Sequence, residues 1–209
     1  MKKAGKGLFL VLEGLDGCGK SVQAALLAER LGNLGRKVRA LREPGSTPPG
    51  EKVRELLLDP ATGSLDPATE ALLFMACRRE LVSREILPAL ERGEDVVLER
   101  FHPSTICYQG AGLGLGTERV EELARWTTPG LEPDLVILLD LPVKEALARL
   151  GPQRDRLEGR GGAYLEKVRR AFLDWAGSRP GVAVVDASLS REDVARALWE
   201  EVKRVLHQG

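Results

Sequence analysis

The chain has 209 residues, of which 43% are hydrophobic and 30% are charged, as in an ordinary soluble globular protein. Its 31 Lys and Arg balance its 31 Asp and Glu, and a net charge of zero argues against a nucleic-acid coat or a polybasic membrane binder. The three cysteines, Cys18, Cys77 and Cys107, are widely spaced and form neither a disulfide framework nor a zinc pattern. The apolar run at residues 8–12 is too short for a signal peptide or a membrane span. We therefore expect a cytoplasmic protein that binds neither nucleic acid nor membrane.

Short apolar runs alternate with segments of helical spacing along the whole chain. Near-continuous apolar runs are typical of strands buried on both faces of a parallel sheet. We expect five of them, at residues 8–12, 38–41, 96–98, 135–139 and 182–185. Apolar residues at helical spacing predict helices over about 21–32, 66–88 and 190–205. Residues 1–209 are therefore predicted to form one α/β domain of three layers, with a five-stranded parallel sheet flanked by helices.

A phosphate-binding pattern occupies residues 14–21, whose sequence GLDGCGKS fits G-x-x-x-x-G-K-[ST] between an expected strand and an expected helix. Glycines let the backbone curl so that successive N–H groups point at phosphate oxygens, and the helix adds the positive end of its dipole. Lys20 is expected to reach the β- and γ-phosphates of ATP, and the Ser21 hydroxyl to ligate Mg²⁺. The other residues expected around ATP in this loop are Gly14, Asp16, Gly17, Cys18 and Gly19.

The sequence also narrows the class of P-loop protein. A GTPase needs an Asn-Lys-x-Asp guanine motif, but the single asparagine, Asn33, is followed by Leu34. The chain is also short for a motor. A small-molecule kinase is therefore the leading class, although a P-loop alone does not decide the chemistry.

Two charged segments follow expected strands, where α/β sheets place ligand-binding loops. The first is REPG at residues 42–45, of which Glu43 and Pro44 are expected at an acceptor site, and the second is Glu99-Arg100. Glu99 can hold Mg²⁺ directly or through water, and Arg100 can clamp a phosphate with two hydrogen bonds. The alternative for each segment is a surface ion pair at a strand end.

Phe74 and Arg78 are four residues apart on an expected helix and so share a face. An aromatic ring that stacks on a base, beside a guanidinium that bonds its edge, can read a nucleobase. On these residues alone, a core Phe74 and a solvated Arg78 are the favoured alternative. Tyr108 and Gln109 add a second aromatic ring with an amide beside it.

These segments occur in the order in which thymidylate kinases carry them, and the chain resembles that family from about residue 8 to residue 205. The resemblance rests on EGLDG at 13–17, REPG at 42–45, LFMA at 73–76, ERF at 99–101, YQG at 108–110 and DRLE at 155–158. It implies a P-loop NTPase fold with a short basic lid at about 150–162. It also implies transfer of the γ-phosphoryl group of Mg-ATP to dTMP, giving dTDP and ADP, and a homodimer.

The resemblance assigns roles on the acceptor side. Phe74 is similar to the ring that stacks on thymine, and Arg78 to the residue that bonds the carbonyl edge of the base. Gln109 is similar to a further base contact, and Tyr108 to the ring that lies against the sugar. Arg100 resembles the arginine that bridges acceptor and donor phosphates.

Other residues match the donor side and its border with the acceptor. Asp16 stands where the family has an acid near the acceptor sugar and phosphate. Arg149 resembles the arginine that packs on adenine, and Ala187 and Ser188 resemble the loop that lines the adenine pocket. Glu99 departs from the family pattern, because aspartate is usual there.

The variable positions of the P-loop hold no Arg or Lys. Family members of this kind place catalytic basic residues in the lid, so Arg154 and Arg156, with Arg160 beside them, are the candidates. A closed lid would exclude water and bring positive charge to the transferring phosphoryl group. The alternative is a mobile, solvated basic loop.

A phosphate monoester is largely ionised at pH 7, because its second pKa is about 6, so transfer to it needs no general base. Three alternatives remain. A deoxynucleoside kinase would need a base, for which Glu43 and Glu99 are the candidates. The acceptor could be another pyrimidine monophosphate. A module that binds nucleotides without catalysis would not need Lys20, Ser21, Glu99 and Arg100 together.

Overall fold

Five parallel strands form the centre of the molecule in a computed structural model that describes residues 7–128, 130–151 and 155–207. The strand order is β2-β3-β1-β4-β5, which confirms the expected five-stranded parallel sheet. The strands are β1 (Phe9–Gly14), β2 (Val38–Arg42), β3 (Asp95–Glu99), β4 (Leu135–Asp140) and β5 (Val182–Asp186).

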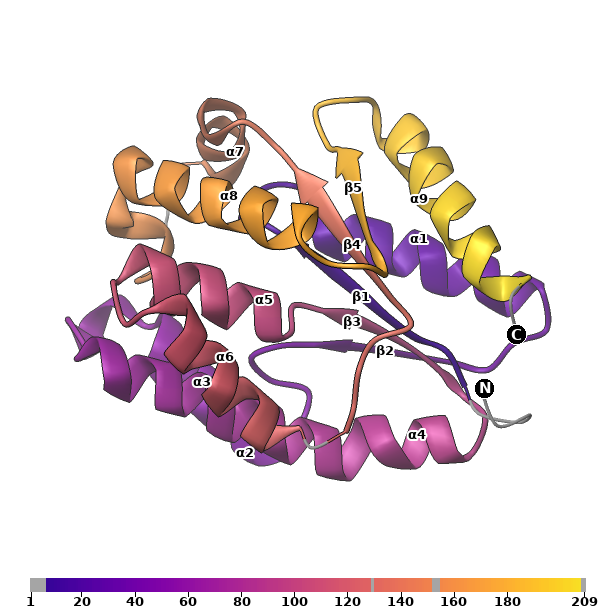
Figure 1. The fold of residues 1–209 in the computed structure, drawn as a ribbon, viewed down its shortest axis with the longest axis horizontal. Coiled ribbons are helices and arrows are strands. Elements are labelled where there is room, and N and C mark those ends of the chain that lie inside the picture. The colour runs from indigo at the N-terminus through magenta and orange to yellow at the C-terminus, as the bar shows by residue number, and fades with distance from the viewer. Residues whose placement is uncertain (1–6, 129, 152–154, 208–209) are drawn as a thin grey trace.

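Helices cover both faces of this sheet (Figure 1). Leu10 and Leu12 of β1 belong to a core that includes residues of α1 and α9, whereas Phe9 and Val11 pack with residues of α3 and α4. This alternation follows from the two-residue period of a strand and gives the three expected layers. The helices are α1 (Lys20–Asn33), α2 (Pro48–Leu58), α3 (Pro67–Leu81), α4 (Leu87–Glu91), α5 (His102–Thr105), α6 (Thr117–Thr127), α7 (Val143–Leu150), α8 (Gly162–Gly177) and α9 (Arg191–Leu206).

Side-chain caps set the start of several helices. Thr47 accepts a hydrogen bond from Gly50 N at 3.1 Å at the start of α2. Asp66 accepts from Ala68 N at 2.9 Å at the start of α3, and Ser190 accepts from Asp193 N at 3.1 Å before α9. Such caps satisfy N–H groups that have no partner inside the helix.

The helix expected over 66–88 is interrupted. The α-helix ends at Leu81, and a π-helical segment, η2 (Val82–Ile86), leads into α4. Pro88 does not stop the helix, because it lies in the first turn of α4, where its missing N–H costs little. A further π-helical segment, η3 (Ile106–Gly112), carries the chain from α5 toward α6.

The carboxyl ends of three neighbouring strands meet at one edge of the sheet. Leu12 and Arg42 are both in register with Glu99 of β3. The chain leaving β2 is tied to β3 by Glu43 N donating to Glu99 O at 2.8 Å, and Arg100 N donates to Leu12 O at 2.9 Å. The P-loop and both predicted charged segments therefore lie together at this edge.

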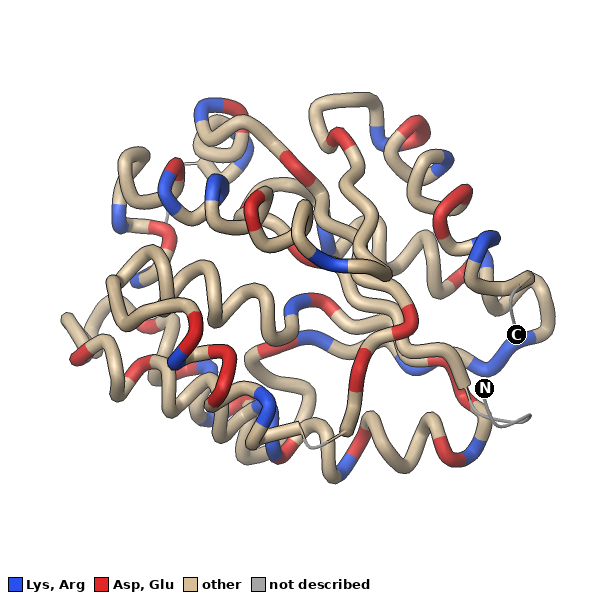
Figure 2. The backbone as a smooth tube through the Cα atoms, in the orientation of Figure 1, with Lys and Arg blue, Asp and Glu red and all other residues tan. Residues whose placement is uncertain are grey.

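Positive and negative side chains are also interspersed in the structure. Figure 2 shows Lys and Arg alternating with Asp and Glu along α9, where Arg196 pairs with Asp193 and Arg204 with Glu201. Across the helices that the structure describes, none combines the length and the apolar character that crossing a membrane requires.

Candidate active site

The P-loop connects β1 to α1 and contains three glycines with positive φ, of which Gly14 and Gly19 lie at its two ends. Gly14 has φ 136°, and a Cβ there would lie 2.5 Å from Leu139 O on the neighbouring strand β4. Gly19 has φ 94° and directly precedes α1. Both backbones favour glycine, so the loop can turn tightly around an anion at the start of the helix. Lys20 Nζ folds back over the loop and donates to Gly14 O at 3.1 Å and to Leu15 O at 2.8 Å.

The two predicted magnesium ligands are in contact with each other. Ser21 Oγ at the start of α1 donates to Glu99 Oε2 at the end of β3, at 2.6 Å. Hydroxyl and carboxylate oxygens are ligands that Mg²⁺ accepts, and this ion usually takes one or two protein groups plus phosphates and waters. No group of three or more His, Cys, Asp or Glu side chains forms a ready-made metal cage among the residues described. The pair therefore fits a metal that arrives with a nucleotide.

Arg100 lies between the P-loop and the acceptor side. Its Nη1 donates to Gly14 O at 3.2 Å and to Ser104 Oγ at 3.0 Å, and its Nη2 forms an ion pair with Asp16. The guanidinium lies 5.2 Å from the centre of the Tyr108 ring, and Tyr108 OH donates to Asp16 Oδ2 at 3.2 Å. Burial alone would raise the pKa of Asp16, but Arg100 and Lys20 lower it to about 2. Asp16 is therefore a carboxylate at neutral pH.

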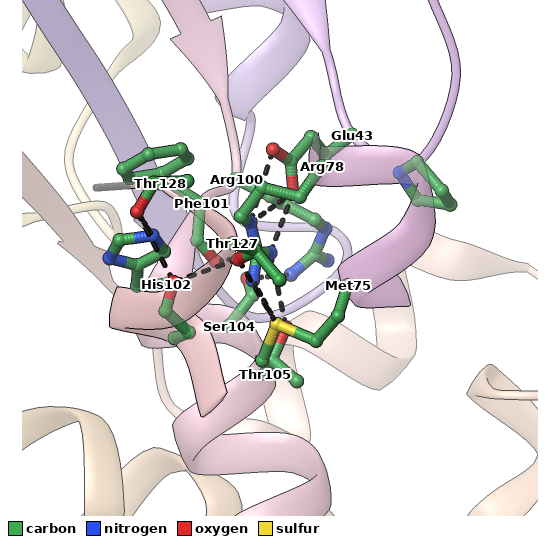
Figure 3. Close-up of polar contacts among 12 residues, drawn as sticks. Glu43, Met75, Arg78, Arg100, Phe101, His102, Ser104, Thr105, Thr127 and Thr128 are labelled. Carbon is green, nitrogen blue, oxygen red and sulfur yellow. Dashed lines mark hydrogen bonds and ion pairs between the residues drawn. The ribbon is translucent and has the colours of Figure 1, made fainter. Parts of the chain in front are cut away.

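Arg78 is 1% exposed, so the interpretation of it as a solvated residue is wrong. Its Nε donates to Glu43 Oε2 at 2.9 Å, and its Nη2 donates to Glu43 Oε2 at 2.6 Å, to Phe101 O at 2.9 Å and to Thr105 Oγ1 at 3.1 Å. Figure 3 shows this convergence of Glu43, Thr105 and Phe101 on one guanidinium. Burial raises the pKa of Glu43 to about 7, although Arg78 lowers it. Helical spacing could not reveal this ion pair, because its partners are 35 residues apart.

One cavity connects these groups. Its empty space, including the open mouth, is about 560 Å³. All eight residues predicted at the acceptor site line it: Asp16, Glu43, Pro44, Phe74, Arg78, Arg100, Tyr108 and Gln109. Six further residues line the cavity without having been predicted there: Arg54, Leu58, Ser104, Thr105, Asp155 and Leu157.

Arg54 is the most informative of the missed residues. It lies on α2, and its Nη1 donates to Pro44 O at 2.8 Å, next to the cis peptide bond between Glu43 and Pro44. The sequence carried a usable signal, because Thr47 followed by two prolines is a helix start. Because α2 was not predicted, Arg54 could not be placed near the site.

The arginine-rich segment 155–160 is packed against α2 and α3. Arg156 Nη2 forms an ion pair with Glu70 at 2.6 Å, Arg160 pairs with the same carboxylate, and Arg156 Nε donates to Leu57 O at 2.7 Å. The Arg156 side chain is 8% exposed, so a solvated loop is the wrong interpretation for this part. Arg154, the other catalytic candidate, lies outside the described residues.

The predicted adenine-side residues lie apart from this cavity. Arg149 is in the last turn of α7 and lies 4.0 Å from Glu145. Ala187 follows β5 and donates its N–H to Asp140 O at 2.8 Å, and the Ser188 hydroxyl donates to Asp186 at 2.6 Å. Within the described part of the chain, no hydrogen bond or ion pair joins Arg149 to Ala187 or Ser188.

Comparison with known proteins shows the family of this chain. The thymidylate kinase family model matches residues 12–198. A thymidylate kinase of Desulforudis audaxviator is 43% identical over 203 residues, covering 96% of this chain and 92% of the relative. Thymidylate kinases of Leifsonia xyli subsp. xyli and Thermosipho melanesiensis are 47% and 40% identical, covering 90% and 95% of this chain and 91% and 97% of those relatives. The chain therefore belongs to the thymidylate kinase family.

Proposed function

We propose that this protein transfers the γ-phosphoryl group of Mg-ATP to dTMP, giving dTDP and ADP. One observation carries the proposal. The cavity lined by Phe74 and Arg78, the pair predicted to read a base, is also lined by Arg100, whose guanidinium reaches the P-loop at Gly14 O. A nucleoside monophosphate in this cavity would present its phosphate to a donor phosphate held by the P-loop.

On the donor side, Lys20 would leave its carbonyl partners for the β- and γ-phosphates, and P-loop N–H groups would hold them. Ser21 and Glu99 would hold Mg²⁺, which neutralises charge on the phosphates when bound. Arg149, Ala187 and Ser188 would line the adenine side, farther along the same edge.

On the acceptor side, Phe74 would stack on the thymine ring. Arg78 would donate to the base through Nη1, because Nε and Nη2 are held by Glu43, Phe101 O and Thr105, whereas Nη1 contacts only the weak acceptor Met75 Sδ, at 3.3 Å, among the described residues. Gln109 would contact the base, and the Tyr108 ring would lie against the sugar.

Catalysis would then consist of alignment and charge neutralisation. The acceptor phosphate is its own nucleophile, so no side chain has to remove a proton. Arg100 would bridge the two phosphates, assisted by basic residues of the lid at 150–162, with Arg154 and Arg156 as the candidates. Glu43 is held by Arg78, which argues against its use as the base of a deoxynucleoside kinase.

We also propose that the protein is a homodimer. Leu72 of α3 is 55% exposed and Trp126 of α6 is 76% exposed, and both line one apolar surface with Ala68, Leu115 and Leu123. Exposed apolar surfaces of this kind mark association sites, and aromatic residues are enriched in them. A second copy of the chain is the occupant that fits the family.

The test measures ADP release from Mg-ATP with dTMP, dUMP, UMP, CMP, dGMP, AMP and thymidine. We expect turnover led by dTMP and a loss of about 100-fold or more in kcat/KM for Arg100→Ala. Arg36→Ala is the matched control, because Arg36 pairs with Asp95 at the opposite edge of the sheet. Preference for another monophosphate would overturn the base assignment, activity with thymidine alone would identify a nucleoside kinase, and no turnover would refute the kinase proposal.

A further inference from the structure

Glu13 is a fully buried carboxylate that the proposed mechanism does not use. It lies near the end of β1, directly before the P-loop, and is 0% exposed. Its Oε1 accepts hydrogen bonds from Phe101 N at 2.7 Å and Ser104 N at 3.2 Å, and its Oε2 accepts from Ser104 Oγ at 2.7 Å. All three donors belong to the segment that follows Arg100.

A carboxylate at this position is costly for the fold. Burying a charge is unfavourable unless it is well paired, and an apolar side chain of similar size often serves stability as well or better. The other buried side chains of β1, Phe9 to Leu12, are all apolar. Burial raises the pKa of Glu13, although Arg100 and its hydrogen bonds to Ser104 and Phe101 lower it. A carboxyl group here therefore calls for a reason connected with the segment it holds.

The residue directly before that segment has a strained backbone. Arg100 has φ 67°, in the left-handed region that residues other than glycine rarely adopt, and such backbones persist only where the surroundings impose them. Arg100 N is held by Leu12 O, and the next N–H, that of Phe101, is held by Glu13. The backbone hydrogen bonds on the two sides of the strained Cα are therefore both made to β1.

Glu13 also controls the side chain of Arg100 through one intermediate. Ser104 Oγ donates to Glu13 and accepts from Arg100 Nη1 at 3.0 Å, so the carboxylate fixes the direction of the hydroxyl. Figure 3 shows Ser104 beside Arg100 in this arrangement. The oriented hydroxyl leaves its oxygen lone pairs toward the guanidinium, which it helps to hold near Gly14 O and Asp16.

We infer that Glu13 is a positioning residue for phosphoryl transfer, and that it acts by fixing the backbone and, through Ser104, the guanidinium of Arg100. This inference rests on the proposed function of Arg100 as the bridge between two phosphates. A guanidinium that spans two anions must be oriented before they meet, and a displacement of about 1 Å at such a group costs up to about 100-fold in rate. Glu13 supplies that orientation from inside the core.

The experiment is a double-mutant cycle on kcat/KM with Glu13→Gln, Arg100→Ala and the double variant. We expect Glu13→Gln to cost about tenfold to 100-fold when Arg100 is present, and about twofold or less in the Arg100→Ala background. Ser104→Ala, which keeps the Phe101 N–H bond to Glu13, is a milder second variant, with an expected loss of about tenfold that also vanishes without Arg100.

Asp95→Asn is the matched control. Asp95 is also a 0% exposed carboxylate that accepts from a backbone N–H, that of Leu8 at 2.8 Å, but at the opposite end of the sheet. The Asp95→Asn variant should have a lower urea midpoint and an unchanged kcat. Equal losses for Glu13→Gln in both backgrounds would overturn the inference, because the effect would then bypass Arg100.

A double-mutant cycle on dTMP binding distinguishes a failure of this inference from a failure of the proposed function. The dissociation constant of dTMP, measured by calorimetry for the same four proteins, needs no turnover. Absence of phosphoryl transfer in the wild type would refute the proposed function, and the coupling between Glu13 and Arg100 in dTMP binding would still decide the inference. Additive effects on binding would then reject it.

Discussion

His102 is a buried side chain that packs next to the residues around Arg78. Its ring stacks on Phe101 with centroids 4.0 Å apart, and its Nε2 lies 2.7 Å from Thr128 Oγ1. Figure 3 draws this contact between His102 and Thr128. Arg78 lies 5.4 Å from the centre of the same Phe101 ring. Burial, together with the positive charges of Arg78 and Arg125, lowers the pKa of His102 from 6.5 to about 2. The neutral ring therefore packs against the residues that hold Arg78.

The shifted pKa predicts how stability depends on pH. The unfolded chain protonates His102 below about pH 6.5 while the folded protein does not, so stability is present above that pH and lost as the pH falls. We expect His102→Gln to reduce the fall in the free energy of unfolding by about 1.4 kcal/mol per pH unit between pH 6 and pH 4. Urea unfolding at four pH values measures both slopes. Loss of packing alone would change the free energy of unfolding equally at every pH. Parallel curves for the wild type and the variant would therefore contradict the prediction, because they would mean that His102 is protonated in the folded protein as well as in the unfolded chain.

At the residue scale, helical spacing predicted that Phe74 and Arg78 lie together, but it did not predict the buried groups that hold the site residues in place. Phe74 and Arg78 were paired because helical residues four apart share a face, and both line the cavity. The buried partners Glu43 and Glu13 were not predicted in their observed contacts, because a contact between strand ends and a distant helix leaves no local pattern. Their roles toward a nucleotide remain predictions.

One carboxylate fastens the arginine-rich segment 155–160 to the acceptor side. Glu70 of α3 is 0% exposed, and its Oε2 pairs with Arg156 and Arg160. Its Oε1 accepts from Gln109 Nε2 at 2.9 Å, and Gln109 lines the cavity. Gln109, which is predicted to contact the base, and two arginines of the predicted lid therefore share one anchor.

We expect Glu70→Gln to lower kcat/KM for dTMP by about tenfold, because a neutral amide holds two guanidinium groups and Gln109 less well. The matched control is Glu121→Gln on α6, since Glu121 also binds two arginines, Arg125 and Arg179, away from the cavity. Steady-state kinetics with dTMP and urea unfolding are measured on both variants. Equal kinetic losses, or a loss only in the urea midpoint, would contradict a role of Glu70 in the acceptor site.

At the element scale, the sheet was predictable and several helices were not. Each expected strand overlaps one observed strand, because strands buried on both faces are continuous apolar runs. The sequence did not predict α2, although Pro48 and Pro49 stand at its start. It also did not predict the α3–α4 junction, because a π-helical segment shifts the helical phase there. The short helices α5 and α7 offer too few turns for a clear period.

At the scale of the whole molecule, the acceptor site and the exposed apolar surface share a helix. Phe74 and Arg78 of α3 line the cavity, while Leu72 of the same helix is exposed toward α6, which packs beside α3 (Figure 1). A partner bound to this surface would therefore brace the helix that carries Phe74 and Arg78, the pair proposed to read the base. The balanced net charge leaves no long-range repulsion between two copies.

The dimer is tested by placing charges on that surface. We expect the wild type to have a mass about twice 22.8 kDa in light scattering, and Leu72→Glu combined with Trp126→Glu to give the monomer mass, because a dimer would bury four unpaired carboxylates. Both positions are exposed in the single chain, so the monomer should remain folded by circular dichroism. Leu34→Glu is the control, since Leu34 is 59% exposed but lies after α1, away from this surface. A monomeric wild type would reject the homodimer, and a dimer that survives both charges would move the interface elsewhere. If the dimer braces α3, the monomer should also show a KM for dTMP raised several-fold while its KM for ATP stays close to that of the wild type.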